Sequence, residues 1–367
     1  WLWDADAIVI AGTHGKTTTT SLTGWLLTAA GADPTILVGG IAQNLGADGA
    51  SYRIGQGRAF VIEGDEYDSA YFDKTAKFLK YLPDIAVINN IEFDHADIYR
   101  DLDEVRLAFR RLVNLVPRRG LTLLGIDSLD AAALASVARS RVQTFGLSAD
   151  AEWRAVEIEV GQGTRFRVTR GGADLGAFTM SLLGDHNVRN ALVAIAVGVD
   201  LGLDIERLRE GLASFKGVKR RLEVVGEARG VTVYDDFAHH PTAVEETLKA
   251  IRGAAPGKRI WAIFEPRSAS SCRSVFQDDF ARAFAGADEV VIATVAKSNI
   301  TADQRLSESR LVEDLTARGG RARHLPDVDA IVAAVSAEAR EGDLIVVMSN
   351  GGFGGIHKKL VSALDRP

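Results

Sequence analysis

The first residues suited to chemistry form a short segment rich in glycine and threonine. It follows the apolar run 7–10 and consists of Gly12, Thr13, His14, Gly15, Lys16, Thr17 and Thr18. Glycine lets backbone N–H groups turn toward a phosphate, and the N-terminus of a following helix adds partial positive charge. Lys16 can reach the β- and γ-phosphates of a nucleotide, and the Thr17 hydroxyl can ligate Mg²⁺. The segment predicts a phosphate site; the alternative is a strand-to-helix turn with a solvated lysine.

Two acidic clusters each follow an apolar run and could hold the metal ion. The first follows the run 60–62 and supplies four carboxylates: Glu63, Asp65, Glu66 and Asp68. The second, 89–97, follows the run 85–88 and contains His95. Mg²⁺ prefers oxygen ligands, and an imidazole can bind a second ion or orient a phosphate oxygen. Any one of these carboxylates could instead be a solvated loop residue, but together the clusters indicate metal and substrate binding.

The second half of the chain carries further candidate binding residues. They are Arg221, Asp236, His239, His240, Arg267, Ser349, Asn350 and Gly351. The two histidines precede Pro241 and could act on a reacting group or cap a helix. Arg267 could hold a substrate carboxylate through two hydrogen bonds, or form a surface ion pair. The glycine-rich residues from Ser349 on could form an anion-binding turn or a tight strand-to-helix connection.

Short apolar runs that alternate with longer amphipathic ones must position these residues, and this pattern predicts βαβ units. In the first half we expect strands at 7–10, 60–62, 85–88 and 121–124, helices at 16–30, 187–199 and 205–212, and antiparallel strands within 153–183. In the second half we expect strands at 231–234, 260–264, 289–293 and 344–348, with helices at 242–251, 276–284, 308–317 and 330–339. The phosphate segment and both acidic clusters would then lie at the carboxyl edge of one sheet, where such sheets bind ligands.

The chain is therefore expected to be an α/β protein of two domains. Residues 1–217 would form a domain with a mostly parallel sheet plus a small antiparallel sheet. Residues 218–367 would form a Rossmann-like, doubly wound domain.

Composition excludes several other classes of protein. One cysteine in 367 residues excludes a disulfide scaffold and a cysteine-built zinc site. No apolar run approaches the ~20 residues of a membrane helix, and no signal-peptide pattern is present. A net charge of −6 argues against a protein that coats nucleic acid. We expect a soluble, cytoplasmic enzyme that binds neither nucleic acid nor membrane; the sequence does not indicate an oligomeric state.

Six motifs in order resemble the Mur ligase family of ATP-dependent amide-bond-forming enzymes in peptidoglycan synthesis. They lie at 12–17, 63–68, 90–95, 184–192, 220–223 and 235–242. The resemblance implies a central ATP-binding P-loop domain, a C-terminal domain for the amino acid or peptide, and ATP and Mg²⁺ as cofactors. Lys16 and the loop amides would hold the phosphates, Thr17 and Glu63 would bind a first Mg²⁺, and His95 would help with a second.

The resemblance also implies roles outside the phosphate loop. His186, Asn187 and Asn190 would meet the adenine end of the nucleotide. From the second domain, Asp236 would meet the ribose and Arg221 the phosphates. His239 and His240 would face the reacting carboxylate or the incoming amine. Contacts with substrate are expected at Asp65, Glu66, Asp68, Arg267, Ser349, Asn350 and Gly351.

Within the family, segments such as 72–74 and 265–268 resemble the branch of cell-wall recycling. Its members join UDP-N-acetylmuramate to the tripeptide L-alanyl-γ-D-glutamyl-meso-diaminopimelate through an acyl phosphate. A ligase that adds L-alanine is the first alternative, and a nucleotide-binding module without ligase activity is the second. Family members also carry an N-terminal domain that binds UDP; the chain starts at Trp1, and we expect that domain to be absent from it. A dinucleotide oxidoreductase is disfavoured because Gly15-Lys16-Thr17 stands where Gly-x-Gly-x-x-Gly would be needed.

Overall fold

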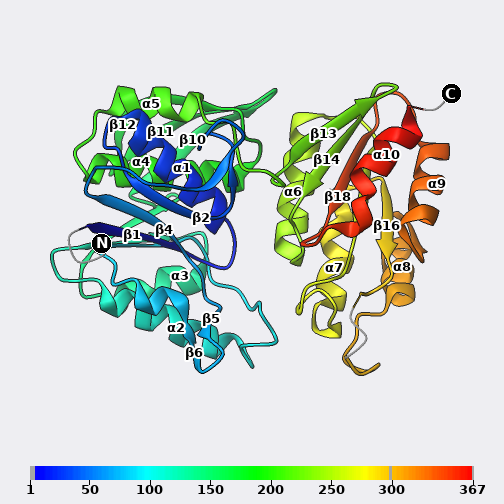
Figure 1. The fold of residues 1–367 in the computed structure, drawn as a ribbon, viewed down its shortest axis with the longest axis horizontal. Coiled ribbons are helices and arrows are strands. Elements are labelled where there is room, and N and C mark those ends of the chain that lie inside the picture. The colour runs from blue at the N-terminus through cyan, green and yellow to red at the C-terminus, as the bar shows by residue number, and fades with distance from the viewer. Residues whose placement is uncertain (1–4, 297–299, 366–367) are drawn as a thin grey trace. The chain divides into compact units, whose positions relative to one another are not determined.

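The computed structural model describes residues 5–296 and 300–365. The chain divides into two compact units, Trp1–Lys219 and Arg220–Pro367 (Figure 1). Each unit is built on its own sheet. Among the described residues, no helix is long and apolar enough to cross a membrane.

The first unit is built around a ten-stranded sheet with a parallel centre. In spatial order the parallel strands are β9 (Arg141–Gly146), β8 (Leu121–Gly125), β7 (Ile85–Ile88), β1 (Asp6–Ala11), β4 (Ala59–Gly64) and β2 (Thr35–Ala42). Beyond β9 the sheet continues with β10 (Trp153–Val160), which is parallel to β9, and then with the expected antiparallel pairings of β10 with β11 (Thr164–Arg170) and of β11 with β12 (Ala173–Met180). β3 (Ala50–Arg53) closes the other edge, and β5 (Asp68–Ala70) and β6 (Asp73–Ala76) form a separate hairpin.

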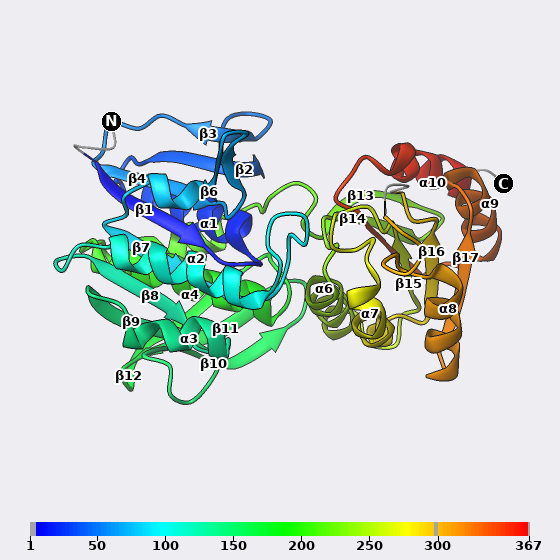
Figure 2. The same cartoon turned by 90° about the horizontal axis from the view of Figure 1, so that it is seen from below.

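Helices cover both faces of this sheet (Figures 1 and 2). One face carries α1 (Lys16–Ala29), α4 (Asp185–Asp200) and α5 (Ile205–Ala213), and the other carries α2 (Leu102–Leu115) and α3 (Leu129–Ala133). The central strand β1 is buried from Ala7 to Ala11, which explains its unbroken apolar run. Asp101 starts α2 by accepting a hydrogen bond from the Glu104 N–H.

The second unit has a six-stranded sheet. Its order is β13 (Glu223–Ala228), β14 (Val231–Asp236), β18 (Leu344–Met348), β15 (Ile260–Phe264), β16 (Glu289–Ala293) and β17 (Arg321–Leu325), with only β13 antiparallel. One face carries α6 (Pro241–Ala254), α7 (Gln277–Ala283) and α8 (Glu308–Ala317), and the other carries α9 (Val328–Glu338) and α10 (Ile356–Leu364). The α/β class and the doubly wound second sheet are as expected.

Several strands were not expected from the sequence, and most are short or partly exposed. In β17, Arg321 and His324 are exposed and the other residues are half-buried. β13 likewise lies at the edge of its sheet and exposes Val224. An edge strand does not need the continuous apolar run by which buried strands are recognised.

Candidate active site

The phosphate segment forms a tight turn between β1 and the start of α1. Gly12 has φ +137° and Gly15 has φ +81°, values that side chains rarely tolerate. A Cβ on Gly12 would lie 2.9 Å from Cβ of Asn89, and one on Gly15 would lie 2.7 Å from Oδ1 of Asn190. Both glycines are therefore required by the backbone and by close neighbours.

The end of β7 holds this turn in place. The N–H of Thr13 donates to the carbonyl oxygen of Asn90 (3.0 Å), and that of His14 donates to Oδ1 of Asn90 (2.8 Å). The Thr13 hydroxyl accepts from the N–H of Glu92 (2.8 Å), and Nδ2 of Asn89 donates to Oγ1 of Thr19 (3.0 Å). Asn89 and Glu92 lie in the expected cluster 89–97, but their role in holding the phosphate turn was not expected, although two asparagines directly after a buried strand were a usable signal.

Lys16, Glu66 and His95 form a buried charged group beside the turn. Nζ of Lys16 donates to the carbonyl oxygens of Gly12 (2.8 Å) and Thr13 (3.1 Å) and to Oε1 of Glu66 (2.8 Å). Nε2 of His95 lies 2.9 Å from the same Glu66 oxygen. The side chains of Lys16, Glu66 and His95 are only 13%, 3% and 11% exposed.

The charges in this group outweigh the effect of burial on each pKa. Burial alone would lower the pKa of Lys16, but Glu66 raises it, and so do Glu63 and Asp65. Burial alone would raise the pKa of Glu66, but Lys16 and His95 hold it below its usual value. Burial alone would lower the pKa of His95, yet the hydrogen bond to Glu66 and the charge of Asp94 raise it.

Thr17 and Glu63 supply oxygens suited to Mg²⁺ on the other side of the lysine. Oγ1 of Thr17 donates to Oε1 of Glu63 (2.9 Å), and the N–H of Gly39 donates to Oε2 (2.6 Å). A hydroxyl next to a carboxylate is a donor set that fits a hard cation. The next residue, Thr18, is buried in the first turn of α1.

The other two carboxylates of the first cluster pair with lysines. Asp65 lies 3.1 Å from Nζ of Lys77, and Asp68 lies 2.8 Å from Nζ of Lys74. Asp68 belongs to β5, so its pair lies within the β5–β6 hairpin.

The start of α4 lies against the turn. Oδ1 of Asn190 accepts from Oγ1 of Thr19 in α1 (2.9 Å), and Nδ2 of Asn190 donates to Oδ1 of Asn187 (3.1 Å). Asn187 in turn donates to the carbonyl oxygen of Leu183 (2.8 Å). His186 precedes these residues in the first turn of α4, so the structure brings the expected nucleotide residues of the first unit together.

At the end of β14, charged side chains mainly brace the backbone. The carboxylate of Asp236 accepts from the N–H groups of Leu222 (2.7 Å) and Ala238 (2.8 Å). Nη2 of Arg220 donates to the carbonyl oxygens of Ser349 (2.6 Å) and Gly351 (2.7 Å). Asp236 and Arg220 therefore fix the loops around this edge of the sheet.

The arginine and the histidines that flank Asp236 lie in the same loop region. The guanidinium of Arg221 lies 4.9 Å from the centre of the Phe237 ring. His240 caps α6 by accepting from the N–H of Thr242 (3.3 Å), with Pro241 in the first turn, which is the capping alternative considered above. Nδ1 of His239 lies 2.9 Å from the carbonyl oxygen of Phe237.

Residues after β15 and β18 meet at the same edge. Oγ of Ser349 donates to Glu265 and accepts from the N–H of Gly351 (2.9 Å). Nη1 of Arg267 lies 3.7 Å from Oε1 of Glu265 and its side chain is 51% exposed. Asn350, between Ser349 and Gly351, is half-buried.

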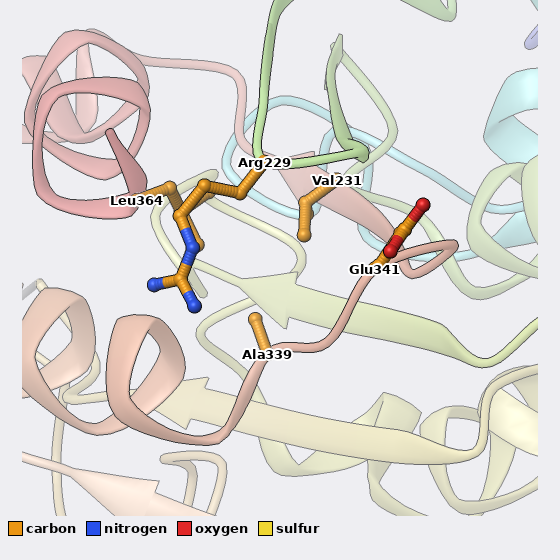
Figure 3. A pocket seen from close by; sticks show the side chains of 5 residues that line it. All are labelled: Arg229, Val231, Ala339, Glu341 and Leu364. Atoms are coloured by element: carbon orange, nitrogen blue, oxygen red, sulfur yellow. The ribbon is translucent and has the colours of Figure 1, made fainter. Parts of the chain in front are cut away.

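A cavity of about 390 Å³ in the second unit lies elsewhere (Figure 3). It is lined by Arg229, Val231, Ala339, Glu341 and Leu364, as the close view shows. Val231 begins β14, so this cavity lies at the amino edge of the sheet, opposite the residues described above. Ligands of parallel sheets bind at the carboxyl edge, and the cavity is therefore not a candidate active site.

Comparison with known proteins identifies the family. Residues 10–198 match the Mur ligase middle domain, and residues 220–351 match the Mur ligase, glutamate ligase domain. The chain is 38% identical to the UDP-N-acetylmuramate–L-alanyl-γ-D-glutamyl-meso-2,6-diaminoheptandioate ligase of Escherichia coli, over 100% of this chain and 77% of that protein. It is 37% identical to the UDP-N-acetylmuramate–L-alanine ligase of Salinibacter ruber, over 97% of this chain and 73% of that one. The crystal structure of a murein peptide ligase from Psychrobacter arcticus superposes with a TM-score of 0.73 at 33% identity, over 100% of this chain and 78% of that chain. The chain belongs to the Mur ligase family.

Proposed function

We propose that this protein joins UDP-N-acetylmuramate to the tripeptide L-alanyl-γ-D-glutamyl-meso-diaminopimelate, with conversion of ATP to ADP and phosphate. The observation that carries the proposal is the buried Lys16, Glu66 and His95 group beside the Thr17–Glu63 pair, at the carboxyl edge of a parallel sheet. Members of the family use ATP, and the Escherichia coli relative named above is a ligase of these two substrates.

The chemistry accounts for these residue types. A carboxylate is a poor acyl donor, so it first accepts the γ-phosphoryl group of ATP; the amine then attacks the acyl phosphate and phosphate leaves. Phosphoryl transfer needs positive charge around the transferred group rather than a covalent partner in the protein. Lys16 and the N–H groups of the turn would bind the β- and γ-phosphates. Thr17, Glu63 and His95 would hold Mg²⁺, which when bound supplies further positive charge.

The remaining residues would bind the rest of the substrates. His186, Asn187 and Asn190 would contact the adenine end of the nucleotide. From the second unit, Asp236 would contact the ribose, Arg221 the phosphates, and His239 or His240 the reacting carboxylate or amine. The half-exposed guanidinium of Arg267 is suited to a carboxylate of the tripeptide, beside Ser349, Asn350 and Gly351.

A ligase that adds L-alanine is the second candidate, because the Salinibacter ruber relative is nearly as similar. ADP release with UDP-N-acetylmuramate, measured with the tripeptide or with L-alanine as acceptor, separates the two. We expect release that depends on the tripeptide and is unchanged by L-alanine; the opposite result contradicts the proposal. Ligation that is unaffected by Lys16→Ala or Glu63→Ala would instead indicate a nucleotide-binding module.

A further inference from the structure

The two carboxylate oxygens of Glu66 have very different surroundings. Oε1 accepts from Nζ of Lys16 and lies 2.9 Å from Nε2 of His95. Oε2 is buried and has no hydrogen-bond partner. A buried acceptor without a partner destabilises the protein, and more so when the group is charged. This oxygen therefore calls for a partner that binds with the substrates.

The charges around Glu66 indicate what that partner is. Glu63 and Asp65 also act on Lys16, and Asp94 lies 3.9 Å from Nε2 of His95. With Glu66 these make four carboxylates, against the ammonium groups of Lys16 and Lys77 and the imidazole of His95. A carboxylate oxygen can only accept, so a cation satisfies both Oε2 and the excess of negative charge.

His95 is placed to share such a cation. Its φ of +54° is a backbone conformation that side chains rarely adopt, and its ring lies against Tyr67, with 4.2 Å between the ring centres. The strained backbone and the ring contact together hold the imidazole next to Glu66. Glu63 differs from Glu66 because both of its carboxylate oxygens have partners: Oε1 accepts from Thr17, and Oε2 accepts from Gly39.

We propose that Glu66 is a ligand of a divalent cation, which it binds together with His95, and that before nucleotide binding the same carboxylate neutralises Lys16. This inference rests on the proposed function, because the nucleotide phosphates must draw Lys16 away. Lys16 then exchanges Glu66 for phosphate oxygens, and the cation takes the place of the ammonium group. Glu66 is thus assigned to the metal rather than to the substrate contact expected from the sequence.

Titration with Mn²⁺, followed by electron paramagnetic resonance of the free ion, tests this assignment. The wild-type protein and Glu66→Gln are titrated with a non-hydrolysable ATP analogue present. We expect Glu66→Gln to bind one Mn²⁺ fewer per chain than the wild type. Glu210→Gln is the matched control, because it makes the same substitution at an exposed glutamate of α5 outside both acidic clusters, and it should bind as many Mn²⁺ ions as the wild type.

Affinity for ADP in EDTA tests the second part of the proposal. Without a cation, Lys16 must leave the charged hydrogen bond to Glu66 before it can bind phosphate. Glu66→Gln weakens that bond, so we expect ADP to bind about tenfold more tightly than to the wild type, equivalent to ~1.4 kcal/mol. Glu66→Gln is thus expected to bind ADP more tightly when metal is absent and to bind one cation fewer when metal is present. A structural role alone does not produce this pair of changes.

The outcomes separate this inference from the proposed function. If Glu66→Gln binds the nucleotide and as many Mn²⁺ ions as the wild type, the inference is wrong and the function stands. If the wild type binds no nucleotide, the proposed function is wrong. If Glu66→Gln does not fold, Glu66→Asp replaces it: the charge remains for Lys16, but the oxygens are one methylene further back. Loss of one Mn²⁺ in Glu66→Asp supports the assignment, and full binding overturns it.

Discussion

The carboxyl edges of the two sheets use charged residues in different ways. In the first unit charged side chains pair with one another: Lys16 with Glu66, and Glu66 with His95. In the second unit charged side chains make more bonds to the backbone: Arg220 donates to two carbonyl oxygens besides its ion pair with Asp235 (3.2 Å), and Asp236 accepts from two backbone N–H groups.

This difference separates residues that can change hydrogen-bond partners when a ligand binds from residues that hold the surrounding loops in place. A ligand of the first unit can replace Glu66 as the partner of Lys16, because one charged hydrogen bond is exchanged for another, provided that a cation then takes the place of the ammonium group beside Glu66. A ligand of the second unit cannot recruit Arg220 without releasing the loop after β18. It must therefore use side chains such as Arg267, which is half-exposed. This contrast predicts effects on ligation that decrease from Lys16 through Gly12 and Arg267 to Asp343.

Lys16→Met should have the largest effect. We expect ADP release to fall by about 10³-fold or more, because the charge proposed to stabilise the transferred phosphoryl group is lost. The variant should also be less stable, since Glu66 stays buried without its ammonium partner. Kinetics and thermal unfolding measure the two effects.

The double variant Lys16→Met/Glu66→Gln is the control for that change. It removes both charges of the pair, so we expect stability to recover while ligation stays lost. A double variant as unstable as Lys16→Met would show that the pair is not the source of the instability.

Alanine at two glycines, one at each edge, should give unequal results. In Gly12→Ala the new Cβ would lie about 3 Å from Cβ and the backbone nitrogen of Asn89, and alanine would have to adopt a φ of +137°. We therefore expect the variant to bind nucleotide more weakly and to lose about 2 kcal/mol of folding stability. In Gly351→Ala the three atoms nearest the new Cβ all belong to the flexible Arg267 side chain, the closest at 2.5 Å, and this side chain can move away. That variant should keep its stability and its KM for ATP, and raise the KM for the acceptor. Equal losses of stability would contradict the contrast.

The sequence predicts the parts of this molecule that depend on neighbours in the chain. The strands 85–88 and 344–348 are recognised because burial on both faces demands an unbroken apolar run. The phosphate turn is recognised because its glycines and lysine are adjacent. Lys16 and Glu66 are 50 residues apart, and Arg220 and Ser349 are 129 apart. No local sequence pattern predicts such pairs. The structure is therefore needed to tell residues that can change partners when a ligand binds from residues that hold the loops in place.

Arg267→Ala should affect only the acceptor. We expect the KM for the tripeptide to rise about tenfold, with the KM for ATP unchanged, because a two-point contact with a carboxylate is lost. Stability should not change, since Arg267 is half-exposed and lies 3.7 Å from Glu265, which keeps its hydrogen bond from Ser349. Arg282→Ala, which removes another exposed arginine of the second unit, should leave both KM values unchanged. A higher KM for ATP in Arg267→Ala would place this arginine with the nucleotide instead.

Asp343→Asn should change stability and leave ligation almost unaffected. Asp343 lies at the amino edge of the second sheet, where it accepts from Arg259 and from Nε1 of Trp261 (3.0 Å), and its side chain is 5% exposed. Burial alone would raise the pKa of Asp343, but the hydrogen bonds from Arg259, Arg340 and Trp261 hold it below its usual 3.8. We expect the variant to lose about 2 kcal/mol of stability at pH 7 and to keep its kcat and KM values.

The pH dependence of that loss distinguishes charge from shape. Because the folded pKa of Asp343 is lower than the unfolded one, its ionised carboxylate stabilises the fold above pH 3.8. This contribution declines as the pH falls through the folded pKa. The difference in Tm between wild type and Asp343→Asn should thus be constant at neutral pH and shrink below about pH 4. If the difference persists at the lowest pH where the wild type stays folded, the asparagine disturbs packing. The amino edge of this sheet would then depend on shape rather than on charge, unlike the Lys16–Glu66 pair.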